Sequence, residues 1–321
     1  MSAAEREGRI AAGLDRFEDQ LYDWIGHGLA YLSRRPQELE SAAAALVDAQ
    51  AGGLASQLRR LSEDPRDGDG WPARLLERLS SLHLALRAYR VQESIEPSLR
   101  AELRRMVGWH ATRASLASEA RETDRYFVLG RALHDDEPIR SQRIWLCGRR
   151  SGRYALLLEF AYAGRAFEWK MTPGTLRELE LVYYPAAVPL RAAVFESEAA
   201  TGRRRAAPRF RAADLSAVCG CVDELREAAA LFAAALARNP WIECIPLRLQ
   251  NVVAVVVDER PLLCDRFGAC VAVDERCRGI WELVALGGGG AVDCFGEWRG
   301  DAFWPLSLCV DGRFVSLSDG G

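Results

Sequence analysis

The spacing of apolar residues changes near residue 121, and this change constrains the fold more than any other feature of the chain. Before it, apolar side chains recur in steps of three and four, the period of one face of an α-helix. After it, short runs rich in aromatic and branched residues read as β-strands. We therefore expect an α+β protein, with a helical N-terminal domain followed by antiparallel β-rich modules with an intervening helix.

The N-terminal region predicts amphipathic helices at 8–33, 37–61, 72–92, 97–107 and 109–120. Gly52-Gly53 interrupts the second, which indicates a kink or a close helix–helix approach. The stripes of the first and third helices would offer docking faces if they are wider than the core needs. These stripes are Ile10, Leu14, Phe17, Leu21, Ile25, Leu29 and Leu32, and then Leu75, Leu76, Leu79, Leu82, Leu86 and Tyr89.

The segment 141–163 is a hairpin signal, because two apolar runs flank the Gly-bounded polar turn 148–152. A second such turn is Asp311-Gly312. We expect strands at 125–133, 140–148, 153–161, 176–184, 190–196, 246–258, 261–264, 269–273, 291–298, 303–310 and 313–317. Helices are expected at 214–238, with Asp214 as N-cap, and at 275–286.

These elements divide the chain into a helical domain, 1–122, and an antiparallel β domain, 123–198. The segment 199–213 reads as a basic linker, and 214–321 as a helix plus a C-terminal β domain.

The composition is that of an ordinary globular protein, with 49% hydrophobic and 27% charged residues and a net charge of -3. Nucleic-acid binding would therefore need a local basic patch. No run approaches the roughly 18 to 20 apolar residues of a membrane span, and the N-terminus does not read as a signal peptide, so we expect a cytoplasmic protein that does not contact membranes. The nine cysteines, odd in number and irregularly spaced, predict reduced thiols.

No motif predicts an enzyme or a cofactor. Lys170 is the only lysine and follows no glycine-rich loop, which excludes a P-loop ATPase. No GxSxG elbow occurs, and no cysteine has a histidine near it. Gly287–Gly290 follow a predicted helix and lead into a strand, so they indicate a helix stop rather than a phosphate cradle.

Two short segments are candidates for metal or acid–base chemistry. Cys219-Gly-Cys221 falls in a predicted helix, where residues two apart face different directions, and no histidine follows His134. We interpret these cysteines as structural thiols. His134-Asp135-Asp136-Glu137 favours a solvated turn between strands, with divalent-metal binding or acid–base catalysis as the alternative.

Arginines form the only dense basic groups. They lie at the predicted hairpin tip and in the predicted linker, where they could neutralise phosphates or simply be exposed in an arginine-rich chain. The candidate nucleic-acid contacts are Arg149, Arg150, Arg153, Arg203, Arg204, Arg205, Arg209 and Arg211.

Several motifs together resemble the region that follows the zinc finger in bacterial SWIM zinc-finger family proteins. They are LVDAQAGGLA (46–55), QRIWL (142–146), SGRYALLL (151–158), Tyr184-Pro185 with Pro189-Leu190-Arg191, FGEW (295–298), Pro305-Leu306-Ser307 and Asp311-Gly312-Arg313-Phe314. The family's zinc motif, CxC followed by CxH, is absent from this sequence, since Cys219-Gly-Cys221 comes too late and no CxH follows it.

Such proteins typically occur beside MoxR-type AAA+ ATPases and von Willebrand A-domain proteins. The resemblance therefore implies a non-enzymatic adaptor with these protein partners and without the family's zinc. A nucleic-acid-binding subunit that uses the arginine groups is the alternative.

Overall fold

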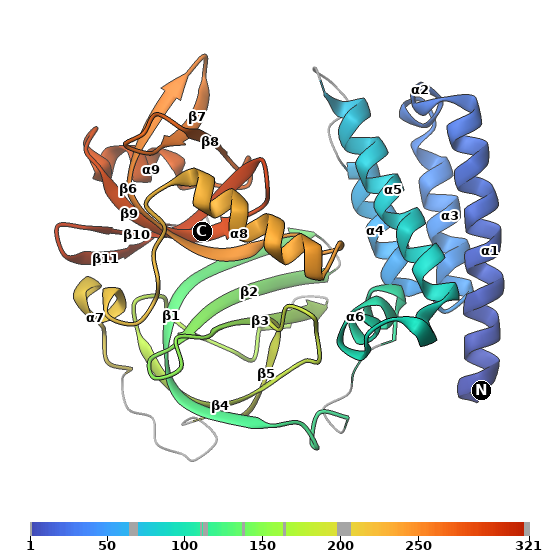
Figure 1. Ribbon diagram of the computed structural model, residues 1–321, viewed down its shortest axis with the longest axis horizontal. Coiled ribbons are helices and arrows are strands. Elements are labelled where there is room, and N and C mark those ends of the chain that lie inside the picture. Colours follow the sequence, from blue (N-terminus) through green and yellow to red (C-terminus); the bar gives the residue numbers. More distant parts are fainter. Residues whose placement is uncertain are drawn as a thin grey trace. The chain divides into compact units, whose positions relative to one another are not determined.

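The computed structural model describes residues 2–63, 70–109, 111, 115–136, 139–162, 165–197 and 207–317. The chain forms two compact units (Figure 1): a helical unit, Met1–Ser115 with Pro185–Ala187, and a β unit, Leu116–Tyr184 with Val188–Gly321. A helical region followed by largely antiparallel sheets confirms the predicted α+β class. None of the helices in the described ranges has the length and apolar content that a membrane span requires.

The helical unit follows the predicted order with different boundaries. Its elements are α1 (Ala3–His27), α2 (Leu29–Ser33), α3 (Pro36–Asp48), α4 (Gly52–Glu63), α5 (Trp71–Arg90), a 3-10 turn (Gln92–Ser94) and α6 (Pro97–Val107). Ser2 and Glu5 form a capping box that starts α1. Gly28, with a φ of 88°, divides the helix predicted at 8–33, because few other residues adopt that conformation.

The helix predicted at 109–120 is wrong: its described residues, 109, 111 and 115–120, form coil and turns. Gly108 ends α6, and Trp109 packs against the bundle instead of starting a helix. The guanidinium groups of Arg6 and Arg104 lie 4.2 and 4.3 Å from the centroid of its ring. In the sequence, an aromatic residue that packs against the end of a bundle looks the same as one that belongs to the apolar stripe of a helix.

The predicted break at Gly52-Gly53 is both a helix boundary and a close approach. A Cβ at Gly53 would lie 2.2 Å from the carbonyl oxygen of Met106, near the end of α6. Only glycine therefore fits at this contact between α4 and α6.

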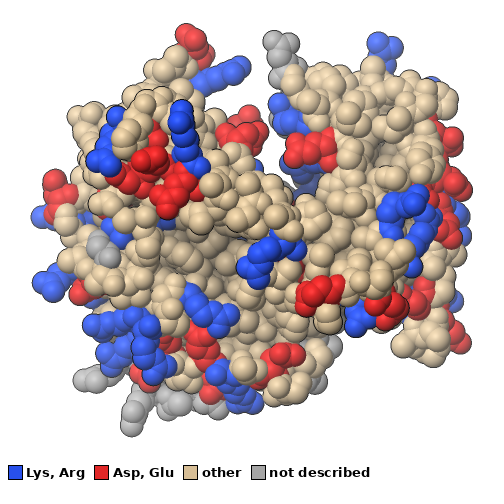
Figure 2. All heavy atoms as spheres, in the orientation of Figure 1, with Lys and Arg blue, Asp and Glu red and all other residues tan. Residues whose placement is uncertain are grey.

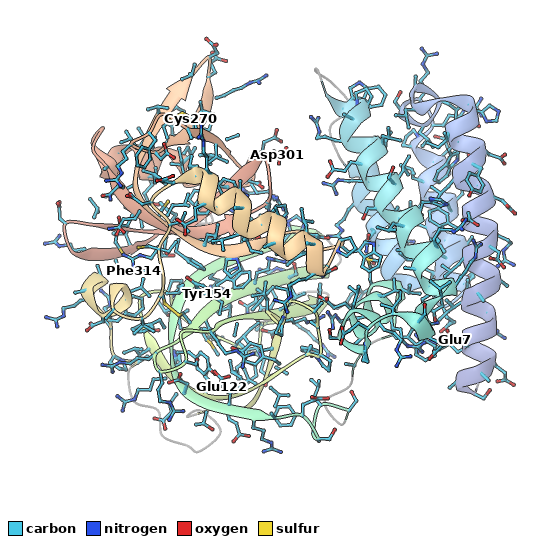
Figure 3. All side chains as sticks on the ribbon, viewed as in Figure 1. Glu7, Glu122, Tyr154, Cys270, Asp301 and Phe314 are labelled. Carbon is cyan, nitrogen blue, oxygen red and sulfur yellow. A yellow bond between two sulfur atoms is a disulfide. The ribbon has the colours of Figure 1, made fainter. Side chains whose placement is uncertain are left out.

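A polar cluster around Glu7, which is labelled in Figure 3, ties three helices of this unit together. Its carboxylate accepts hydrogen bonds from Tyr89 Oη on α5 at 2.5 Å and from Gln92 Nε2 at 3.0 Å. It also pairs with Arg104 Nη2 on α6 at 3.1 Å. Burial raises the pKa of Glu7, but these hydrogen bonds and the Arg104 charge outweigh it and lower the pKa.

The first sheet of the β unit has the order β3-β2-β1-β4-β5, and every neighbouring pair is antiparallel. Its strands are β1 (Arg121–Asp136), β2 (Ile139–Gly148), β3 (Tyr154–Tyr162), β4 (Leu176–Tyr183) and β5 (Ala192–Ser197). The predicted hairpin is confirmed as β2 and β3, joined by a turn over residues 149–153.

The second sheet has the order β11-β10-β8-β7-β6-β9, and β10 also pairs with β9. Its strands are β6 (Ile245–Val257), β7 (Arg260–Cys264), β8 (Cys270–Val273), β9 (Val292–Trp298), β10 (Ala302–Val310) and β11 (Arg313–Ser316). The short β8–β10 pair is parallel, and the others are antiparallel. Asp311 and Gly312 form the predicted hairpin turn, with φ values of 49° and 72°.

The single helix predicted at 214–238 is wrong in its first half. The chain instead forms α7 (Ala212–Ser216), a non-helical segment, and α8 (Leu225–Arg238). Asp214 is the third residue of α7 rather than its N-cap. Val222 in the intervening segment bridges to Leu249 of β6, so sheet pairing overrides helix propensity there.

The remaining helix, α9 (Ile280–Gly287), starts later than predicted and ends where Gly288 adopts a left-handed conformation, which confirms the helix stop.

Both predicted β modules lie in one unit and share a core. Phe127 and Trp145 of the first sheet belong to the same buried cluster as Leu247 and Phe303 of the second. A Cβ at Gly130 on β1 would lie 2.7 Å from the Leu306 side chain on β10, so the two sheets approach closely at a position where β1 has no side chain.

The prediction that the cysteines are reduced thiols is wrong for four of them, which form two disulfides. Cys147 on β2 bonds to Cys219, which is 72 residues away in the sequence. Cys264 bonds to Cys270 across the neighbouring strands β7 and β8. The spacing of the cysteines along the sequence does not indicate these pairs. Their sulfur atoms come together through strand pairing in one case and through the packing of a distant loop in the other.

Candidate functional site

The helical unit carries an apolar surface where α1 and α5 pack together. Tyr22 and Ile25 on α1 remain 54% and 48% exposed, and Leu76 on α5 remains 46% exposed. Ile25 and Leu76 belong to the apolar stripes predicted for the first and third helices. The stripes are therefore wider than the core needs, and we call these three residues the α1–α5 strip.

Contacts between the two helices place the members of this strip along one junction. Glu7 contacts Tyr89, while Tyr22 contacts His83 through Tyr22 Oη and His83 Nε2 at 3.2 Å. Residue numbers therefore rise along α1 as they fall along α5. Ile25 lies one turn beyond Tyr22, and Leu76 lies two turns before His83, so both extend in the same direction along the junction.

Paired charges border this strip. Glu18, which is buried, accepts from His83 Nε2 at 3.0 Å and pairs with Arg90 Nη1 at 2.5 Å. Arg90 also pairs with Asp15 at 2.6 Å. Burial raises the pKa of Glu18, but the bonds and charge of Arg90 and the bond from His83 lower it overall. The rim is thus charged but locally neutralised, as at many protein interfaces.

The arginines of the β2–β3 turn are exposed, as expected, but partly satisfied by the β unit itself. Arg153 pairs with Glu122, labelled in Figure 3, at 2.6 Å and stacks on Tyr183. Arg150 donates from Nη2 to the carbonyl oxygen of Thr123 at 2.5 Å. The side chain of Arg149 is exposed at the tip.

The other predicted basic group is only partly described. Arg203, Arg204 and Arg205 lie outside the described residues. Arg209 is exposed and bridges to Thr175, so it belongs to an ordered edge rather than a free linker. Arg211 is exposed and lies 3.8 Å from Asp214.

The Cys147–Cys219 disulfide links the end of β2, just before the turn, to the segment that follows α7. Figure 2 shows positive and negative side chains interspersed over the visible face of the β unit, with a group of positive ones at its lower left.

A buried charge cluster joins the two sheets, and the sequence did not predict it. Glu297 on β9 is fully buried. Its carboxylate accepts from Arg143 Nε at 2.8 Å and Trp145 Nε1 at 2.7 Å, both on β2, and pairs with Arg299 at 2.5 Å. The motifs QRIWL and FGEW therefore meet through Glu297. The only sequence signal was an acidic residue placed between aromatic ones in a buried strand.

The electrostatics of this cluster favour the ionised form of Glu297. Burial raises the pKa of Glu297, but the charges of Arg143 and Arg299 and the bonds from Trp145 and Arg143 lower it to about 2. Burial and the nearby Glu297 charge raise the pKa of Cys244 to about 12, so this thiol stays protonated near neutral pH. This fully paired and buried carboxylate links the two sheets.

The predicted metal and acid–base candidates do not form a site in the described part of the chain. Cys219 is in a disulfide and lies outside any helix, so the predicted helical placement of this cysteine pair is wrong. Cys221 is exposed, with Sγ 2.8 Å from Gln250 Oε1. His134 is exposed on β1; the side chains of Asp135 and Asp136, and all of Glu137, lie outside the description. Within the described residues, no three His, Cys, Asp or Glu side chains could hold a metal ion.

Comparison with known protein families matches residues 5–107 to the SWIM-associated four-helix bundle domain. The match ends at the last residue of α6 and includes the motif at 46–55, so it confirms the resemblance for the helical unit. The other motifs that carry the resemblance lie outside the matched residues. No curated protein and no solved structure matches the chain.

Proposed function

From the premise that residues 5–107 form a SWIM-associated four-helix bundle domain, we propose that this protein is a non-enzymatic adaptor of a MoxR-type AAA+ ATPase and a von Willebrand A-domain protein. The domain match is the observation that carries the proposal. The partners are the proteins beside which such family members typically occur, and family resemblance alone leaves them to experiment. A cytoplasmic location is part of the same proposal and rests on the N-terminal sequence, which does not read as a signal peptide.

The α1–α5 strip supports a role in protein binding. Aromatic and aliphatic side chains surrounded by polar groups are typical anchors of protein interfaces. Tyr22, Ile25 and Leu76 are this kind of side chain, and the bundle leaves about half of the surface of each uncovered.

The first test is an affinity pull-down with the full-length protein, carried out with and without nuclease. We expect nuclease-resistant recovery of the ATPase or the von Willebrand A-domain protein, measured by mass spectrometry. The same experiment with Ile25→Glu/Leu76→Glu should lose the partner, because two charges would have to be desolvated in the interface. Val47→Glu, at an exposed apolar position on α3, is the matched control and should retain it. Equal recovery by all three proteins would exclude the strip as the binding surface.

Nucleic-acid binding through the arginines is the second candidate. The disulfide between Cys147, which precedes the turn at 149–153, and Cys219, which follows Arg211 and α7, favours it, because it ties these two parts of the chain together. The pairs with Glu122 and Asp214 work against it, since they reduce the positive potential. Binding to single- and double-stranded DNA at several salt concentrations tests this candidate. A steep salt dependence that is lost in Arg149→Gln/Arg209→Gln would support it.

A further inference from the structure

A cavity of about 460 Å³ opens on the β unit beside the segment 166–173, which connects β3 to β4. Arg131 on β1, Arg140 on β2 and Lys170 on the segment itself supply three cations to its wall. Among the described residues that line it, there is no carboxylate. The volume lies within the range typical of small-molecule sites.

A single buried side chain, Gln142 on β2, holds parts of the cavity wall in place through hydrogen bonds. It is 0% exposed, and its Nε2 donates to Glu159 Oε2 at 2.6 Å and to the carbonyl oxygen of Trp169 at 2.8 Å. Its Oε1 accepts from Arg131 Nε at 3.0 Å. Gln142 therefore fixes the position of one cation and of the segment that carries another. Such support for a binding site reduces the entropy lost when a ligand binds.

Glu159 on β3 completes this support. Its carboxylate accepts the backbone N–H groups of Glu168 and, at 3.2 Å, of Trp169. The negative charge of Glu159 is thus used to hold the segment, and Glu159 does not line the cavity.

The apolar part of the wall includes two aromatic side chains and a methionine. Phe167 and Met171 are buried, and Trp169 is half-buried beside them. The guanidinium carbon of Arg140 lies 5.4 Å from the centroid of the Phe167 ring. Arginine and lysine bind phosphate oxygens, and an indole face stacks on a planar base. The cations alone would suit any anion, but a half-buried indole adds selectivity for a ring.

We propose that this cavity binds a nucleoside phosphate, with the phosphate on Arg131 and Lys170 and the base against Trp169. The proposal is independent of the adaptor function and of the arginines at the β2–β3 turn. The same chemistry is present in a free nucleotide and at the 5′ end of a nucleic-acid strand.

Calorimetric titration of the full-length protein with AMP tests the proposal. We expect saturable binding of AMP that is tighter than that of ribose 5-phosphate or adenosine. Arg131→Gln and Lys170→Gln should each weaken it about tenfold, the effect expected when a charge-assisted hydrogen bond is lost. The control Arg260→Gln, at an exposed position on β7, should bind as the wild type does.

The variant Trp169→Leu separates a specific site from a loss of folding. It should bind ribose 5-phosphate about as well as the wild type does and lose the preference for AMP. A 5′-phosphorylated dinucleotide that binds more tightly than AMP would identify a strand end as the source, and equal binding would identify a free nucleotide. The absence of saturable AMP binding in the millimolar range, or unchanged affinity in both cation variants, would overturn the proposal.

Discussion

At the scale of single residues, the β unit depends on one buried carboxylate. Glu297 is surrounded by Arg143, Trp145 and Arg299, and together these groups link β9 to β2. Removing one partner from a buried ion pair leaves the other charges without compensation, which costs more than losing a surface pair. The contact between the sheets should therefore be sensitive to small changes at Glu297.

We predict that Glu297→Gln destabilises the protein by about 3 kcal/mol at neutral pH, because Arg143 and Arg299 lose their counter-charge in a buried setting. Urea unfolding measures this change. Glu93→Gln removes the exposed partner of Arg100 and is the matched control, for which we expect an unchanged midpoint. If both variants unfold at the same urea concentration as the wild type, Glu297 is not a stabilising link.

The lowered pKa of the same carboxylate predicts that the protein loses stability on acidification. The folded pKa of Glu297, about 2, lies below the ordinary value of 4.5, so its stabilisation is complete above pH 4.5 and is lost as the pH falls towards 2. The difference in unfolding free energy between wild type and Glu297→Gln should thus shrink by about 3 kcal/mol across this window. Urea unfolding at intervals between neutral and acidic pH measures it. A difference that stays constant, or grows, on acidification would contradict the assignment.

The sequence did not predict these residue-level features, because they depend on which strands face each other. Arg143 and Glu297 were both in motifs that carried the resemblance, yet nothing in the sequence paired them. The periodicity also placed Ile25 and Leu76 in apolar stripes without showing that both remain exposed. A helical stripe shows which residues share a face, but it does not show how much of that face a neighbour covers.

At the scale of elements, the joint between α4 and α6 depends on glycine. We predict that Gly53→Ala destabilises the protein by about 1–3 kcal/mol, because the added methyl group has no room beside the Met106 carbonyl. Gly52→Ala is the adjacent control: a Cβ there meets nothing within 4 Å, and alanine favours the helix. Thermal unfolding followed by circular dichroism compares the two. Equal destabilisation by both would indicate a general helix effect instead of a close contact.

The Cys147–Cys219 bond should stabilise the β unit, because it closes a loop of 72 residues. A disulfide typically contributes about 2–4 kcal/mol of stabilisation. We predict that peptide mapping of protein purified without reductant finds this cross-link, and that reductant lowers the unfolding midpoint. Cys147→Ala/Cys219→Ala should show a smaller response to reductant, and Cys221→Ser should respond as the wild type does. Recovery of Cys147 and Cys219 as free thiols without reduction would contradict the bond.

Most elements followed from the sequence because local signals and tertiary structure agree there. Alternating apolar residues and glycine-bounded turns set the strands and the β2–β3 and β10–β11 hairpins. The failures, 109–120 and the start of 214–238, lie where a segment packs on a distant element: Trp109 against Arg6, and Val222 against Leu249. Contacts of this kind leave no periodic trace. The candidate cavity was missed for the same reason, since Arg131, Arg140 and Lys170 come from three separate segments.

At the scale of the whole molecule, the two compact units each bury a core of their own. A substitution inside one core should therefore change local stability mainly in that unit. Gly53→Ala belongs to the helical unit, and Glu297→Gln belongs to the β unit. Together they form a matched pair of probes.

We predict that Gly53→Ala increases hydrogen exchange in peptides from α1 to α6 and leaves β1 to β11 unchanged, while Glu297→Gln does the reverse. In the double variant the two effects should add, because distant and independent sites are usually additive. Hydrogen-exchange mass spectrometry of the full-length protein measures both regions in one experiment. If either single variant increases exchange in both units to the same extent, the chain unfolds as one cooperative body.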